Sequence, residues 1–266
     1  MGGSGIAAHK GISREGHQAV YMRNLGLSLV APAYNEGKSI AKFARTTDRV
    51  LSGLDLGDYE IIVVDDGSTD DTWGILKSLT GEIPGMVVTR HDENRGYGAA
   101  IMTGIELARM DYIAYTDADL QFDLLDLSRF IEQLRAFDAV LGYREMRQDP
   151  GYRIIMARAY NEISNRIFGL PSVIDIDCAL KVFRRSTLES VSPHLSGFGF
   201  DLELVAKLAR KGYPFVQVPV RHIGRCQGKS KVNIPRVLET LREIMALSRE
   251  LSGMTEDPAA RARSGT

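Results

Sequence analysis

Short apolar runs alternate with longer amphipathic stretches along the first half of the chain. Runs such as "IIVV" predict strands buried on both faces, and apolar positions three and four apart predict helices. The predicted strands cover residues 25–32, 59–68, 85–91, 112–119 and 138–144. The predicted helices cover residues 36–54, 69–79, 96–110 and 124–137. This alternation is typical of a mostly parallel sheet with helices on both faces.

The second half is less regular but contains the same kinds of segment. Amphipathic spacing predicts helices at 151–170, 200–213 and 234–251, and apolar runs predict strands at 179–185 and 214–224. Pro219 cannot donate to a strand ladder, so the last strand is expected at an edge of the sheet. The apolar face of the final helix would be covered by the core or, alternatively, by a membrane or a partner.

The length of 266 residues suits one large α/β domain better than two small ones. We expect that domain over residues 25–252, with a twisted, mostly parallel sheet. Residues 1–24 are Gly-rich and polar, which predicts a flexible tail, and residues 253–266 are expected to be disordered.

Composition narrows the function classes. The formal net charge is −1, so no overall field would recruit nucleic acid, and any basic site must be local. The two cysteines form no C-x-x-C pair, which fits a reducing, cytoplasmic location. No apolar run approaches the roughly 20 residues of a spanning helix. Peripheral contact with the cytoplasmic face of a membrane stays open, as does assembly of identical copies.

Acidic residues begin where the predicted strands end, at "AYNEG", "DDGSTDD", "DENRG" and "DADLQ". In such sheets, ligands bind beyond the carboxyl ends of the strands. Asp117 and Asp119 follow a buried strand, and Gln121 would point the same way if the extended course continues. Two carboxylates and an amide oxygen suit Mg²⁺ or Mn²⁺, which takes further ligands from substrate phosphates. A metal-dependent site for a phosphorylated substrate is therefore predicted.

Four segments of residues 25–145 together resemble the nucleotide-sugar-binding half of family 2 glycosyltransferases, which have the GT-A fold. They are "VAPAYNEGKSI", "YEIIVVDDGSTDDT", "NRGYGAAIMTGI" and "DADLQ". In residues 146–252 and just before them, "GYR", "DIDCALKVFRR", "FGFDLELVAKLARKGY" and "GRCQGKSK" resemble dolichyl-phosphate mannosyltransferases and bacterial polyprenyl-phosphate glycosyltransferases. Those families move a sugar from a nucleoside diphosphate to a lipid phosphate. The resemblance implies a metal-dependent, inverting hexosyltransferase that uses a GDP- or UDP-linked sugar.

The resemblance also assigns residues to the donor. Asp117, Asp119 and Gln121 would bind the metal, and the small Ala118 would let the donor approach closely. Acids at strand ends would accept hydrogen bonds from a base or a ribose hydroxyl. The residues that would hold the nucleotide are Pro32, Ala33, Tyr34, Glu36, Val64, Asp65, Asp66, Asn94, Arg95 and Gly96.

Basic residues would serve the acceptor and the leaving group. The residues that match positions near the acceptor phosphate are Arg144, Arg153 and Arg158. Guanidinium forks suit a phosphate in such a place. Arg225, Ser230 and Lys231 match a family loop, R-x-x-G-x-S-K, that closes over the diphosphate. There, Arg225 and Lys231 would stabilise the charge released with the nucleotide.

The chain departs from those families near the expected acceptor. A D-x-T-G-x-F-K/R motif reads "DIDCALK" here, so Asp177 stands where the families have threonine. An acid there would disfavour a phosphate and could instead act as a base for a hydroxyl, as could Glu203. Asp201 is equally well explained as a favourable neighbour of a helix dipole. A polyprenyl phosphate, a soluble hydroxyl acceptor such as a sugar or secondary metabolite, and non-catalytic binding of a sugar nucleotide all stay open.

Overall fold

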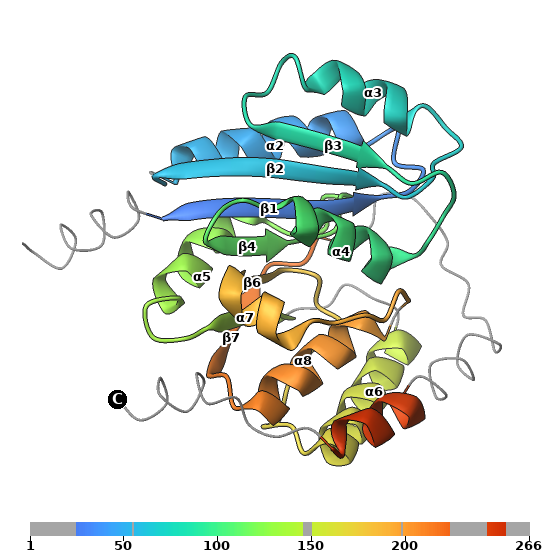
Figure 1. The fold of residues 1–266 in the computed structure, drawn as a ribbon, viewed down its shortest axis with the longest axis vertical. Helices are drawn as coiled ribbons and strands as arrows, with labels where there is room; N and C mark the ends of the chain where they lie inside the picture. The colour runs from blue at the N-terminus through green and yellow to red at the C-terminus, as the bar shows by residue number, and fades with distance from the viewer. Residues whose placement is uncertain (1–24, 55, 146–150, 198, 224–243, 254–266) are drawn as a thin grey trace, which may run out of the picture.

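One sheet of seven strands forms the centre of the computed structural model, which describes residues 25–54, 56–145, 151–197, 199–223 and 244–253 (Figure 1). The strands are β1 (Gly26–Ala33), β2 (Asp58–Asp65), β3 (Met86–Arg90), β4 (Tyr112–Tyr115), β5 (Ala139–Arg144), β6 (Lys181–Arg184) and β7 (Phe215–Val220). In space they follow the order β3-β2-β1-β4-β6-β5-β7. Of these seven strands only β6 is antiparallel to its neighbours, so the expected mostly parallel sheet is confirmed.

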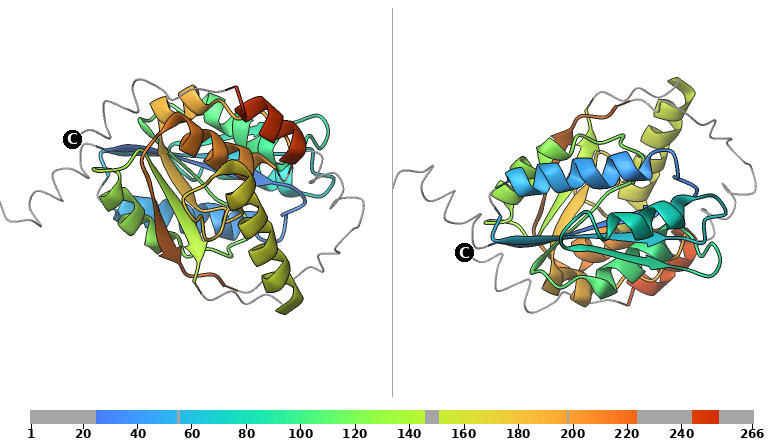
Figure 2. Two further views of the ribbon diagram at one scale, coloured as in Figure 1. Left: turned by 90° about the horizontal axis from the view of Figure 1, so that it is seen from below. Right: turned by 90° about the horizontal axis from the view of Figure 1, so that it is seen from above.

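Helices cover both faces of the sheet, as the alternation of segments predicts (Figure 2). The helical segments are α2 (Ile40–Gly53), α3 (Thr72–Leu79), α4 (Tyr97–Leu107), the 3-10 turn η1 (Leu124–Asp126), α5 (Leu127–Gln133), α6 (Gly151–Phe168), α7 (Arg185–Val191), α8 (Phe200–Lys211) and residues 244–251. Side chains of α2, α3 and α5 enter one core, and those of α4, α7, α8 and residues 244–251 enter the other.

The strand sequences explain the two cores. In β2, Ile61 and Val63 belong to the core under α2 and α3, whereas Ile62 and Val64 belong to the core under α4. All four are fully buried. Because successive side chains of a strand point to opposite faces, a strand that is apolar at every position specifies a sheet covered on both sides.

The topology gathers several loops at one edge of the sheet. The parallel strands bring their carboxyl ends together there (Figure 1). β6 runs the opposite way, and Tyr115 at the end of β4 pairs with Lys181 at the start of β6. The loop that enters β6 therefore reaches the same edge as the loops that leave β1, β2, β4 and β5.

The remaining expectations about the chain have separate outcomes. β7 lies at an edge of the sheet, as Pro219 predicts. Residues 244–251 are helical, with Ile244 buried and Met245 exposed, whereas residues 234–243 lie outside the described part. The tail at 1–24 and all but the first residue of the tail at 253–266 also lie outside it. Within the described ranges, no helix has the length and apolar character needed to cross a membrane.

Candidate functional site

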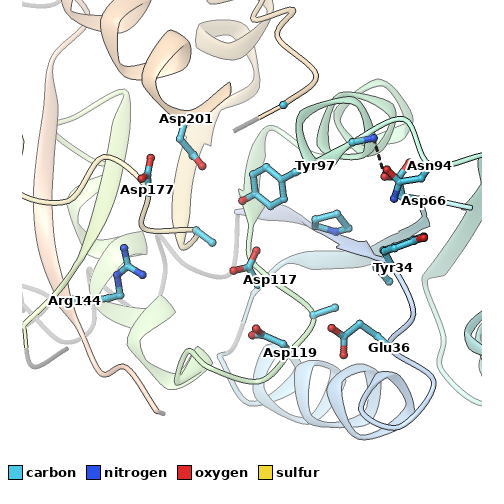
Figure 3. A pocket seen from close by; sticks show the side chains of 16 residues that line it. Tyr34, Glu36, Asp66, Asn94, Tyr97, Asp117, Asp119, Arg144, Asp177 and Asp201 are labelled. Carbon is cyan, nitrogen blue, oxygen red and sulfur yellow. Dashed lines mark hydrogen bonds between the residues drawn. The ribbon is translucent and has the colours of Figure 1, made fainter. Parts of the chain in front are cut away.

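A cavity of about 590 Å³ lies at the edge where the strand ends meet (Figure 3). Loops after β1, β2, β3 and β4 line one side, and the end of β5, the loop before β6 and the start of α8 line the other. Its lining residues are Pro32, Ala33, Tyr34, Glu36, Asp66, Asn94, Gly96, Tyr97, Asp117, Ala118, Asp119, Arg144, Asp177, Ala179, Gly197 and Asp201. Six of these carry carboxylates and one carries a guanidinium, so the described lining is strongly acidic.

Asp66 ties the loop after β3 to the end of β2. Its Oδ1 accepts a hydrogen bond from Arg95 N at 2.8 Å, and its Oδ2 accepts one from Gly96 N at 2.9 Å. Oδ1 also lies 2.7 Å from His91 Nδ1, and the other ring nitrogen lies 2.9 Å from Thr103 Oγ1. Gly96 has φ of 99°, a conformation that glycine adopts without strain. Asp66 therefore faces the cavity and also fixes the shape of its wall.

Three side chains expected beside the nucleotide lie elsewhere, which corrects that expectation. Val64 is fully buried in the core under α4. Asp65 is also fully buried, and its Oδ2 lies 3.2 Å from Arg90 Nε. Arg95 uses its backbone N–H on Asp66, and its exposed side chain is not part of the cavity lining. Strand alternation explains the position of Asp65, because consecutive side chains point to opposite faces and only one of the two acids Asp65 and Asp66 can face the cavity.

Asp117 and Asp119 follow directly after β4 and both line the cavity (Figure 3). Ala118 lies between them and also lines it, as expected. Two carboxylates in an acidic lining form a donor set that suits a hard divalent cation such as Mg²⁺ or Mn²⁺. The chemistry of these residues therefore fits the metal that the sequence predicts.

Gln121 does not join that pair. Its side-chain amide donates a hydrogen bond to Asp119 Oδ2, its Oε1 lies 3.2 Å from His222 Nε2, and it is not part of the cavity lining. The expected alternation breaks at Leu120, whose φ of 61° is left-handed, so the extended course ends before Gln121. The prediction of Gln121 as a third metal ligand is therefore wrong for this conformation. Gln121 instead orients Asp119.

Arg144 connects the main cavity with a smaller one of about 280 Å³. Its Nε and Nη2 donate to the two oxygens of Asp175 at 2.7 and 2.8 Å. Burial alone would lower the pKa of Arg144, but the hydrogen bonds and charge of Asp175 outweigh it and raise that pKa above its usual range. Arg158 of α6 lines the smaller cavity, whereas Arg153 lines neither. The structure therefore brings together two of the three arginines expected at the acceptor.

Asp177 faces the main cavity from the loop before β6 (Figure 3). Its side chain is open to the cavity, and no described residue makes a hydrogen bond or ion pair with it. The pKa of Asp177 is raised to about 7, although solvent reaches the side chain. Desolvation by the surrounding protein is the main cause, and the negative charges of Asp201 and Asp175 add to it. Lys181 and Arg144 act in the opposite direction.

Glu203, expected to be catalytic, has a structural position instead. It is fully buried and accepts hydrogen bonds from His194 N at 3.0 Å and Leu195 N at 2.7 Å. Its Oε1 also lies 2.5 Å from Lys207 Nζ, which in turn lies 3.3 Å from Glu250 Oε1. Because its lone pairs are taken by the protein and it does not line the cavity, the catalytic expectation for Glu203 is wrong.

Asp201 takes the place at the cavity that Glu203 does not. It is buried, and its Oδ1 accepts hydrogen bonds from Lys181 Nζ at 2.5 Å and from Tyr115 Oη at 2.7 Å. Both acids lie in the first turn of α8, so the sequence signal was the same and only the rotation of the helix separates them. The ring of Tyr115 also lies under Lys181, with Nζ 5.4 Å from the ring centre.

Tyr97 is a lining residue that sequence reasoning missed. Its hydroxyl is buried and has no hydrogen-bond partner among the described residues. Burial, followed by the charges of Asp201 and Asp117, raises the pKa of Tyr97 well above its usual value, so the phenol stays protonated. Its place directly after Gly96 in "NRGYG" was the available signal.

Arg225, Ser230 and Lys231, the residues of the expected loop over the diphosphate, lie outside the described residues.

Comparison with known sequences gives consistent matches. A sequence model described as "Glycosyl transferase family 2" matches residues 28–192. An undecaprenyl-phosphate 4-deoxy-4-formamido-L-arabinose transferase from Sodalis glossinidius is 31% identical over 222 residues, which is 82% of this chain and 66% of that protein. Glycosyltransferase AglD from Haloferax volcanii is 31% identical over 219 residues, 79% of this chain and 35% of that protein. The chain thus spans just under two thirds of the first relative and about one third of the second.

Solved structures share the fold. Glucosyl-3-phosphoglycerate synthase from Mycobacterium tuberculosis, in complex with Mn²⁺, UDP and glucosyl-3-phosphoglycerate, matches with a TM-score of 0.64 and 20% identity, over 94% of this chain and 88% of that one. Its complex with Mn²⁺ and UDP-glucose gives 0.65 at 20% identity, over 94% and 86%. This likeness confirms the expected GT-A architecture.

Proposed function

The chain belongs to glycosyl transferase family 2, and from this premise we propose that it moves a sugar from a nucleoside diphosphate to the phosphate of a polyprenyl lipid. The observation that carries the proposal is that Asp117 and Asp119, after β4, and Arg144, at the end of β5, reach one cavity. The name of the Sodalis glossinidius relative, which specifies undecaprenyl phosphate for that protein, supports the same acceptor class.

On the donor side, we assign the nucleotide to the wall formed by Tyr34, Glu36, Asp66 and Asn94. Tyr34 is 47% exposed, so its ring is available to stack on a base. Glu36 and Asp66 offer carboxylate oxygens to base N–H groups or ribose hydroxyls. These contacts suit either UDP or GDP, so both belong in the test.

Asp117 and Asp119 would hold Mg²⁺ or Mn²⁺ beside the diphosphate. The cation would neutralise the charge that develops on the leaving nucleotide. Gln121 supports this by holding Asp119 in the cavity through the hydrogen bonds of its two N–H groups. The acidic lining supplies the cation with a favourable potential that no described lysine in the cavity opposes.

The proposed transfer balances without a proton. An oxygen of the acceptor phosphate forms a bond to the anomeric carbon, and the bond from that carbon to the diphosphate oxygen breaks. The electron pair of the broken bond leaves with the nucleoside diphosphate. Attack from the face opposite this leaving group inverts the anomeric centre. A phosphate monoester is already an anion near neutral pH, so no general base is required. Arg144 and Arg158, which share the smaller cavity, would orient this phosphate.

Contact with a membrane surface would bring such a lipid to the site. α6 extends from the body of the protein (Figure 2) and carries exposed apolar side chains along its length. They are Tyr152, Ile155, Met156, Ile163 and Ile167. We therefore place the protein at the cytoplasmic face of a membrane, held peripherally, with α6 beside the lipid.

A hydroxyl acceptor is the second candidate, and Asp177 is the observation that favours it. Its carboxylate faces the cavity and its pKa is raised to about 7, which suits a base near neutral pH. In this reaction Asp177 would take the proton of the attacking hydroxyl. Removing that base would slow transfer by about 10²–10⁴-fold.

The test compares matched acceptors that differ only in the phosphate. Purified protein is incubated with Mn²⁺, UDP- and GDP-linked hexoses and pentoses, and either undecaprenyl phosphate or undecaprenol in detergent. Pentoses are included because the sequence predicts a hexose, whereas the Sodalis glossinidius relative is named for an arabinose derivative. We expect product only with undecaprenyl phosphate, with inversion seen by NMR. Transfer only to alcohols, lost in Asp177→Asn, would replace this proposal with the second candidate.

A further inference from the structure

The charged side chains on the acceptor side of the cavity form ion pairs, with one exception. Arg144 is bound by both oxygens of Asp175, at 2.7 and 2.8 Å. Lys181 is bound to Asp201 at 2.5 Å. Asp177 lies between these pairs in the cavity lining and has no partner among the described residues (Figure 3). Above the pKa of Asp177, which is about 7, the described part of this side therefore presents one uncompensated negative charge.

The position of Asp177 identifies what it would meet. The nucleotide wall of Tyr34, Asp66 and Asn94 lies on the opposite side of Asp117, which puts Asp177 beyond the proposed diphosphate site (Figure 3). A group that extends past the diphosphate toward Asp177 is the sugar. Under the proposed function, the acceptor phosphate needs no base, so this carboxylate has no proton to take.

A carboxylate that faces a sugar discriminates by charge. Sugar hydroxyls can donate hydrogen bonds to it, whereas the carboxylate of a uronic acid would be repelled by it. Arg144 would not rescue such a sugar, because Asp175 already holds its Nε and Nη2 and, under the proposed function, the guanidinium orients the acceptor phosphate. The other lining residues nearby, Ala179 and Gly197, add no charge.

We propose that Asp177 makes the site selective for neutral sugars, by accepting hydrogen bonds from sugar hydroxyls and repelling uronic acids. This inference rests on the proposed function, because it takes the donor to be a sugar nucleotide. It gives a role to the acid that stands in place of the threonine of related families.

The experiment measures donor binding without any acceptor. Dissociation constants are determined by calorimetry in Mn²⁺ at pH 8, above the pKa of Asp177, for UDP, UDP-glucose and UDP-glucuronate, and for GDP, GDP-mannose and GDP-mannuronate. Each sugar pair differs only at carbon 6. We expect the wild type to bind the neutral sugar of its preferred nucleotide at least about tenfold more tightly than the acid. Asp177→Asn should shrink that ratio at least fivefold and leave the nucleoside diphosphate within twofold.

Asp92→Asn is the matched control, since Asp92 is an exposed acid outside the cavity lining and should leave the ratio unchanged. A ratio that Asp177→Asn does not change, or a wild type that prefers the uronic acid, would overturn the role of Asp177. Failure of the wild type to bind any of the six nucleotides would overturn the proposed function and this inference together. Selective binding without transfer to undecaprenyl phosphate would support Asp177 and reject only the lipid acceptor.

Discussion

The two sides of the cavity hold their carboxylates in different ways. On the donor side, Asp66 is bound mainly by backbone N–H groups and Asp119 by the amide groups of Gln121. On the acceptor side, Asp201 is paired with Lys181 and Asp175 with Arg144. Neutral donors orient a carboxylate without cancelling its charge, whereas a lysine or arginine cancels it.

This difference explains why a divalent cation and an anionic acceptor can share one cavity. The described lining of the donor side carries four carboxylates and no lysine or arginine, whereas on the acceptor side the ion pairs leave Asp177 without a described cation beside it. A cation would therefore find two carboxylates, Asp117 and Asp119, on the donor side and only the single carboxylate of Asp177 across the described part of the cavity. Breaking an ion pair on the acceptor side should therefore lower the free energy of unfolding, and removing a metal-binding carboxylate on the donor side should weaken binding.

The largest expected effect comes from breaking a pair on the acceptor side. Lys181→Met leaves Asp201 buried without its cation, which should lower the free energy of unfolding by about 3–5 kcal/mol. Urea unfolding measures this loss, and Lys42→Met, at an exposed lysine of α2, is the control. Adding Asp201→Asn to Lys181→Met should recover part of the stability. A loss below about 1 kcal/mol in the single variant would contradict the claim that buried Asp201 depends on the charge of Lys181.

A smaller effect is expected from the donor side. Asp66→Asn keeps the shape of the side chain but replaces charge-assisted hydrogen bonds, which should cost about 1.5–3 kcal/mol. Hydrogen exchange at Arg95 N or at Gly96 N should become faster, because asparagine offers one acceptor oxygen where the carboxylate offers one to each amide. Unchanged exchange at both amides would show that Asp66 does not hold the loop. Asp92→Asn again serves as the exposed control.

Two tyrosines beside Asp201 offer a matched comparison of hydroxyl groups. Tyr115→Phe removes a hydrogen bond to a buried carboxylate and should cost about 1–3 kcal/mol. Tyr97→Phe removes a buried hydroxyl that no described residue binds, so the unliganded protein should unfold at an unchanged or higher temperature. Equal destabilisation in both variants would show that Tyr97 has a partner.

The smallest effect concerns Asp177 and pH. Its pKa is about 7 in the folded protein and near 4 when unfolded, so between these values the folded chain keeps a proton that the unfolded chain releases. The free energy of unfolding should therefore fall as pH rises from 4 to 7. In EDTA, Asp177→Asn should flatten this slope. Its free energy of unfolding should exceed that of the wild type by the largest amount above pH 7. Parallel pH profiles for the two proteins would contradict the raised pKa.

Sequence reasoning predicted the sheet but not every detail of it. Apolar runs and helical spacing located the elements, because burial on two faces or on one leaves distinct patterns. The direction of β6 was not predictable, since "KVFR" reads as a strand in either direction. Its antiparallel course matters for the site, because it brings Asp177 to the edge where the other strands end.

In the site too, the sequence identified suitable residues, but the fold decides which of them face the cavity. "DADLQ" correctly placed Asp117 and Asp119 in the cavity, but the left-handed Leu120 that turns Gln121 away leaves no mark in composition. The choice between Asp201 and Glu203 depends on the rotation of α8 against the sheet, which is set by packing of its apolar residues. Long-range packing therefore decides which of several suitable residues enters the site.

The central claim is that Asp117 and Asp119 hold a cation that in turn holds the diphosphate. The most direct test titrates UDP and GDP into the protein by calorimetry, with Mn²⁺ or with EDTA, for the wild type, Asp119→Asn and the control Asp92→Asn. We predict binding only with Mn²⁺ in the wild type and control, and a loss of about 10²-fold or more in Asp119→Asn. Equal binding in EDTA, or in Asp119→Asn, would contradict the account.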